Sequence, residues 1–225
     1  MSIIVIFGLL MVVGLIIVSV IHDKQKKEQL RRLQQRRLRV QIDEFNEVLS
    51  CIEQTVGDKN LAKKINDLIF GLLHAMRNLE NKPAPYIDNA LQKVMAHNQE
   101  LENPQLQFRI RYERESDAQI NKTQQQLVET ISLLSNLTSQ GRLTETEFES
   151  FQQQLRWAHL MVGVTSYVAQ GNKSLAISDR VTAQAFYQRA LHQLMESPHP
   201  NPKRLALVRE INEMLEGNRV RLSEH

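Results

Sequence analysis

The chain has 225 residues, with 28 Lys and Arg against 25 Asp and Glu and a net charge of +3. Its only cysteine, Cys51, excludes an intramolecular disulfide and is typical of a protein that works in a reducing compartment. Glycine and proline are scarce, and long stretches rich in Gln, Leu, Glu and Arg contain neither, so the composition predicts an all-α fold.

The first feature along the chain is an uncharged apolar run over residues 3–21, in which fifteen side chains are Ile, Leu, Val or Phe. As a helix this run spans about 28 Å, close to the hydrocarbon thickness of a bilayer. A cleaved signal peptide would begin with basic residues and end at a small-residue cleavage site, whereas only Met1 and Ser2 precede the run and no such site follows it. We therefore expect residues 1–21 to be one transmembrane helix that is retained as a signal-anchor.

A basic segment over residues 22–39 follows the anchor, and Asp23 and Glu28 are its only acidic residues. Positive flanks stay in the cytoplasm, so we expect the N-terminus outside a bacterial inner membrane and residues 22–225 in the cytoplasm. The segment is interpreted as a stalk whose charges point all round the helix and contact lipid headgroups, or else serve only as a topology signal. The basic residues are Lys24, Lys26, Lys27, Arg31, Arg32, Arg36, Arg37 and Arg39.

Without this segment the chain is slightly acidic, with 20 basic and 23 acidic residues and a net charge of −3. The positive balance therefore belongs to the stalk, and the rest of the chain does not indicate nucleic-acid binding.

A first helical subdomain is expected over residues 40–103, and it includes helices at 60–80 and 86–102. An apolar stripe, with spacings of three and four residues, leads from the stalk into this subdomain. We expect the stripe to pack against the chain's own helices; a coiled-coil dimer or a surface for a partner is the alternative. Gly57 predicts the end of that helix, and Asp58 the start of the next. The stripe consists of Leu38, Ile42, Phe45, Leu49, Ile52 and Val56.

Residues 104–140 are predicted to form one long bridging helix, because they are apolar at both ends and polar in the middle. Residues 108–113 alternate like a strand, but no partner strand is evident, so we assign them to the helix. A C-terminal helical subdomain follows at 141–217, with helices at 145–170, 178–196 and 202–216, and residues 218–225 form a flexible tail.

The helix at 145–170 carries the strongest local signals. Thr144 and Glu147 have the spacing of a capping box, and Gly171 predicts its end. Two apolar stripes along it predict a central place in the bundle. The chain is therefore expected to contain one N-terminal transmembrane helix that continues into the stalk. A bundle of about six further helices follows it.

Residues 164–196 resemble a tetratricopeptide helical hairpin at Gly171, Ala183, Tyr187 and Ala190, which match small and aromatic positions of that repeat. In that family such positions let two helices pack closely. The repeat has no second copy here and Gln170 replaces its leucine, so we interpret the four residues as a close helix contact and do not assign the family.

No motif for chemistry occurs: there is no glycine-rich phosphate loop and no His-Glu-x-x-His. Glu196 and His199 have a metal-ligand spacing, but Pro198 breaks the helix that would align them. Cys51 and the helical histidines, such as His159, are interpreted as packed or solvated side chains. The sequence therefore predicts no catalytic residue, no cofactor and no metal, and it does not indicate an enzyme.

These features predict a membrane-tethered scaffold or adaptor whose cytoplasmic helical domain binds another protein. Two alternatives stay open: a tethered ligand sensor or enzyme with a pocket between helices, and a tethered nucleic-acid binder. Homo-oligomerisation also stays open.

Overall fold

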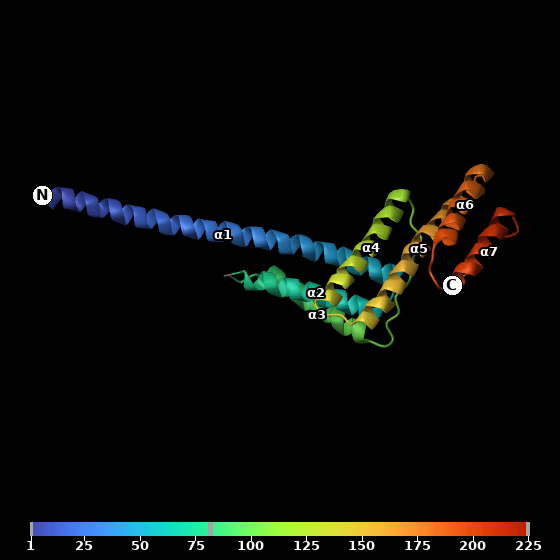
Figure 1. Ribbon diagram of the computed structural model, residues 1–225, viewed down its shortest axis with the longest axis horizontal. Helices are drawn as coiled ribbons and strands as arrows, with labels where there is room; N and C mark the ends of the chain where they lie inside the picture. Colours follow the sequence, from blue (N-terminus) through green and yellow to red (C-terminus); the bar gives the residue numbers. More distant parts are fainter. Residues whose placement is uncertain (1, 81–82, 224–225) are drawn as a thin grey trace. The chain divides into compact units, whose positions relative to one another are not determined.

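The computed structural model describes residues 2–80 and 83–223; the side chains of residues 2–21 and of Asp23 are outside the description. This part of the chain contains seven helices and no strand, as the sequence predicts (Figure 1). The helices are α1 (Ser2–Thr55), α2 (Lys59–Asn78), α3 (Pro85–Glu102), α4 (Asp117–Ser139), α5 (Glu145–Ala176), α6 (Arg180–Glu196) and α7 (Lys203–Leu215).

Within the portion open to description, no helix is both long and apolar enough to cross a membrane. The anchor predicted for residues 3–21 lies outside the residues whose side chains are described.

The residues group into two compact units, of which the first comprises Met1–Asn46 and Asn66–His97. In this unit α2 and α3 run antiparallel, because Asn66 Nδ2 donates to the Val94 carbonyl at 2.9 Å and Arg77 Nε lies 2.9 Å from Asp88 Oδ1. The stalk part of α1 contacts the segment just after α2, where Gln35 Nε2 donates to Glu80 Oε1 at 2.7 Å. The buried apolar side chains include Ile42, Ile69, Leu73, Met76 and Ile87.

The second unit comprises Glu47–Ile65 and Asn98–His225. In this unit α5 is central: α4 packs on it, α6 packs on it, and α7 packs on α6 (Figure 1). This arrangement confirms the prediction from the two apolar stripes of α5. Fully buried side chains from four helices form its core: Leu127, Leu134, Leu155, Val162, Ala190, Leu194, Leu207 and Ile211.

The predicted long helix over 104–140 begins too early, because residues 103–116 are not helical and α4 starts at Asp117. The last carbonyls of a helix lack intrahelical donors. The extended segment supplies one at the end of α1, where the Arg111 N–H donates to the Gln54 carbonyl at 2.7 Å. Ser116 then caps α4 by accepting from the Gln119 N–H at 3.3 Å. The Ser-x-x-Gln spacing of these two residues is a start signal that the sequence prediction missed.

The predicted end at Gly57 is confirmed, since this glycine follows α1 with φ of +70°, and Gly217 likewise follows α7 with φ of +82°. The predicted end at Gly171 is wrong. The helix α5 passes through Gly171 to Ala176, and the left-handed residue that follows it is Ser178, with φ of 65°. Close packing against the ring of Tyr187 explains the glycine.

The start of α5 follows the sequence prediction. Thr144 Oγ1 accepts from the Glu147 N–H at 3.2 Å, and Glu147 Oε2 accepts from the Thr144 N–H at 3.0 Å. These two bonds form the capping box and fix the first turn of α5.

Candidate functional site

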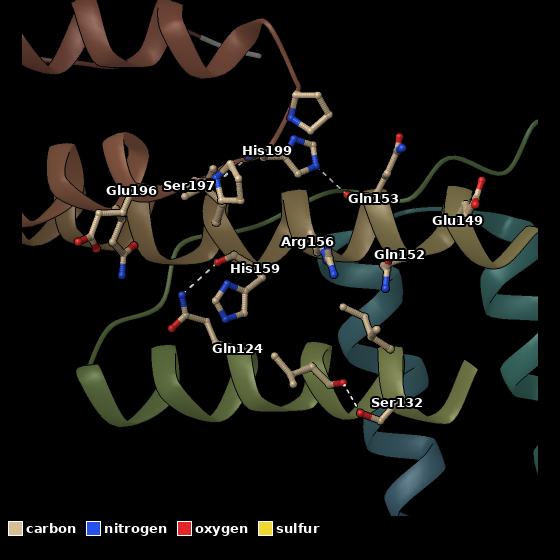
Figure 2. Close-up of a pocket in the computed structure, with 16 residues that line it drawn as sticks. Gln124, Ser132, Glu149, Gln152, Gln153, Arg156, His159, Glu196, Ser197 and His199 are labelled. Carbon is tan, nitrogen blue, oxygen red and sulfur yellow. Dashed lines mark hydrogen bonds between the residues drawn. The ribbon is translucent and has the colours of Figure 1, made fainter. Parts of the chain in front are cut away.

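A groove of about 840 Å³ lies along α5 in the second unit, between α4 and the C-terminal end of α6 (Figure 2). Its volume is typical of ligand-binding pockets. It is lined by Gln124, Val128, Ile131, Ser132, Glu149, Gln152, Gln153, Arg156, His159, Leu160, Gln193, Glu196, Ser197, Pro198, His199 and Pro200.

The floor of the groove is a polar face of α5. Glu149, Gln152, Arg156 and His159 follow one another at spacings of three and four, which brings them to one side of the helix. The two apolar stripes of α5 hold α4 and α6, so this third face is left between them. Leu160 is buried at its base.

Two glutamines close the inner end of the groove over Gly163. Gln124 Nε2, from α4, donates to the His159 carbonyl at 3.1 Å. Oε1 of Gln193, from α6, is buried and accepts no hydrogen bond from the described residues. A Cβ at Gly163 would collide with this oxygen and lie 3.0 Å from Gln124 Nε2, so the missing side chain makes room for both amides.

The rim opposite α4 is formed by the turn after α6. His199 Nε2 lies 3.0 Å from the Gln153 carbonyl oxygen (Figure 2). The ring of His199 lies 5.2 Å from that of Trp157. Because α6 ends at Glu196, His199 lies outside the helix, as Pro198 predicts. Glu196 instead pairs with His192 at 3.2 Å.

Charges in the groove alternate along its length: Glu149 and Glu196 lie at opposite ends, with Arg156 between them (Figure 2). Arg156 and Glu149 are exposed, and neither forms an ion pair within the described part of the chain. Burial lowers the pKa of His159, so its imidazole is neutral at pH 7.

A smaller notch of about 270 Å³ lies beside the end of α1, in the second unit, and includes Cys51 and Arg114 in its lining. Arg114 Nε donates to Thr123 Oγ1 at 3.0 Å, and Lys122 pairs with Glu47 at 2.9 Å. Burial raises the pKa of the Cys51 thiol, with smaller opposing effects from the Thr55 hydrogen bond and the Arg114 charge. The thiol is therefore protonated at neutral pH and is a poor nucleophile.

None of the site residues predicted from the sequence lines the groove or the notch. The basic residues of the stalk are exposed except for Arg31, which is half-buried. In the apolar stripe, Ile42, Leu49 and Ile52 are buried, and Leu38, Phe45 and Val56 are half-buried. This burial favours core packing over a partner surface for the stripe. Among the residues open to the search, no group of three or more His, Cys, Asp or Glu could hold a metal ion.

The sequence left a pocket between helices open as an alternative but did not predict its position. The short glutamine runs at 124–126 and 152–154 supply three of the groove's lining residues. The polar face between the two apolar stripes of α5 was the available signal.

Comparison with known protein families, with curated proteins and with solved structures finds no match to this chain. The fold and the groove therefore define its class only as an all-helical protein with a polar interhelical groove.

Proposed function

We propose that this protein is a single-pass protein of a bacterial inner membrane and a scaffold, rather than an enzyme, whose cytoplasmic helical domain binds another protein. The observation that carries the proposal is the groove on α5. Its walls offer hydrogen-bonding amide and hydroxyl groups above apolar side chains such as Val128, Ile131 and Leu160. Such a mixture is typical of a surface that recognises a polypeptide.

Membrane attachment is proposed from the apolar run at residues 3–21 and the basic stalk after it. A tether raises the effective concentration of a partner at the membrane face without any new contact. Seven of the eight basic stalk side chains are exposed along α1, where anionic headgroups could surround them. Reporter fusions at each end of the full-length chain test the orientation; a cytoplasmic N-terminus would contradict it.

In-cell crosslinking tests the scaffold. A photoreactive residue is placed in the full-length protein at Gln153, in the groove, and in a matched variant at Arg180, which is exposed and not among the groove-lining residues. We expect one partner protein to be captured from Gln153 and not from Arg180. Capture of no protein above background from any surface position would overturn the proposed function.

A ligand sensor is the second candidate, because the volume of about 840 Å³ also fits a small molecule. Retention of a small molecule by the purified protein, lost in a variant that blocks the groove, would favour this candidate. The acidic residues at both ends, Glu149 and Glu196, do not favour nucleic acid.

A further inference from the structure

We infer that the groove on α5 binds an extended peptide segment that carries an acidic side chain near its centre. This inference rests on the proposed function, because it names the chemistry of the segment that the scaffold recognises.

The length of the groove fits a short extended segment. From Glu149 to Leu160 the floor is about 16 Å long. An extended chain rises about 3.3 Å per residue, so about five residues span the floor.

Hydrogen-bond chemistry points the same way. An extended segment brings unpaired N–H and C=O groups, whereas a helix satisfies its own. Glutamine amides both donate and accept, and four of them line the groove from three helices: Gln124, Gln152, Gln153 and Gln193. The buried Oε1 of Gln193 still lacks a donor within the described residues. A small rotation of this side chain would present that acceptor to a peptide N–H.

The charge pattern sets the sequence of the segment. Arg156 lies mid-groove without an ion pair in the described part of the chain, and so an acidic side chain fits opposite it. Glu149 is seven residues earlier on α5, about 10.5 Å away along the helix axis. That span equals about three residues of extended chain, so a basic residue is expected three positions from the acid. Glu196 lies at the opposite end of the groove, so a second basic residue is expected on the other side of the acidic residue of the peptide.

Trp157 is the only tryptophan of the chain, and its contact with His199 makes its fluorescence a reporter of the groove. The probes are two pools of tryptophan-free heptapeptides, added to the full-length protein in detergent micelles. One pool has Glu at position 4 and Lys at positions 1 and 7, and the other has these charges exchanged; the remaining positions hold mixed neutral residues. We expect the acid-centred pool to bind up to about fivefold more tightly, the upper end for an exposed charge pair.

Two charge-reversal variants sharpen the test. Arg156→Glu should weaken the preference for the acid-centred pool, because one of its three charge pairs becomes repulsive, whereas Arg180→Glu, away from the groove, should leave it unchanged. Equal binding of both pools, no binding of either, or an unchanged preference in Arg156→Glu would overturn the inference. A partner that crosslinks at Gln153 through a helical segment would also overturn it. In each of these cases capture at Gln153 still supports the scaffold, so the two proposals fail separately.

Discussion

Tyr187 of α6 lies against the backbone of α5 at Gly171, where a Cβ atom would come within 2.5 Å of Cε1 and 2.8 Å of Cδ1 of its ring. Both residues are buried. The tyrosine hydroxyl donates to Asn172 Oδ1 at 2.6 Å, which holds the ring in this position. With Ala183 and Ala190 also buried, the α5–α6 pair is the close helix contact that the sequence predicts.

Gly171→Ala should therefore destabilise the protein. The methyl group must displace the ring of Tyr187, and overpacking of this kind costs about 1–3 kcal/mol. The higher helix propensity of alanine offsets up to about 1 kcal/mol of this cost. We expect the free energy of unfolding to fall by about 1–2 kcal/mol, measured by denaturant titration with circular dichroism.

Gly71→Ala is the matched control, because Gly71 lies in α2 and no atom comes within 4 Å of its added Cβ. Here only helix propensity changes, and the free energy of unfolding should rise by about 1 kcal/mol. Shifts of the same sign in both variants would contradict the packing explanation.

Ser178→Gly should stabilise the end of α5. Ser178 has φ of 65°, and the Asp179 N–H donates back to the Ser174 carbonyl at 3.0 Å, which closes the helix with a left-handed residue. Glycine relieves the steric cost of this conformation, at some cost in the unfolded chain. We expect a gain of about 0.5–1 kcal/mol in thermal unfolding. Ser178→Ala keeps the Cβ and should give no gain; an equal gain would contradict the backbone argument.

Local sequence predicts some helix ends of this chain correctly, but it does not predict that α5 continues past Gly171 to Ala176. Local signals were sufficient at Gly57 and at the Thr144 capping box, because the partners lie within a few residues. A glycine at Gly171 fits either a helix end or a close packing contact. The choice depends on Tyr187, sixteen positions away, and local sequence does not show it.

The same limit applies to the extended segment over 103–116 and to the groove. The segment is held by the Gln54 carbonyl, far away in sequence. The groove exists because α4 and α6 occupy two faces of α5 and leave Gln152 and Arg156 on the third. A polar helix face looks solvated in the sequence whether or not neighbouring helices enclose it.

Thr144→Ala should weaken the start of α5 by about 1 kcal/mol, the usual value for a lost N-cap. It should also change the titration of Glu147. Hydrogen bonds from Thr144 lower the pKa of this carboxyl below its ordinary 4.5, so its stabilising effect is present above that pH and is lost as the pH falls through the folded-state value. An NMR titration should show the pKa of Glu147 rising in the variant. An unchanged pKa would contradict the role of the cap.

His159→Gln should reduce the loss of stability in mild acid. Burial lowers the pKa of His159 below its ordinary 6.5, so the unfolded state takes up a proton at a higher pH than the folded state does. The stabilising contribution of the neutral His159 side chain is therefore fully present above pH 6.5, and it falls as the pH drops toward the folded-state pKa. Unfolding midpoints between about pH 7 and about pH 5 should fall less in the variant than in the wild type. Equal slopes would show that another group controls this range.

Cys51 should resist thiol reagents in the folded protein. Its side chain is buried, Sγ lies 4.0 Å from Thr55 Oγ1, and burial raises its pKa, so both access and thiolate content are low. Moving the thiol one position, in the double variant Cys51→Ala with Ser50→Cys, exposes it on the same helix. We expect a disulfide reagent to label this variant at least about tenfold faster than the wild type, and denaturant to remove the difference. Fast labelling of native Cys51 would instead make the notch beside Arg114 a reactive site and would contradict its assignment as a packed core residue.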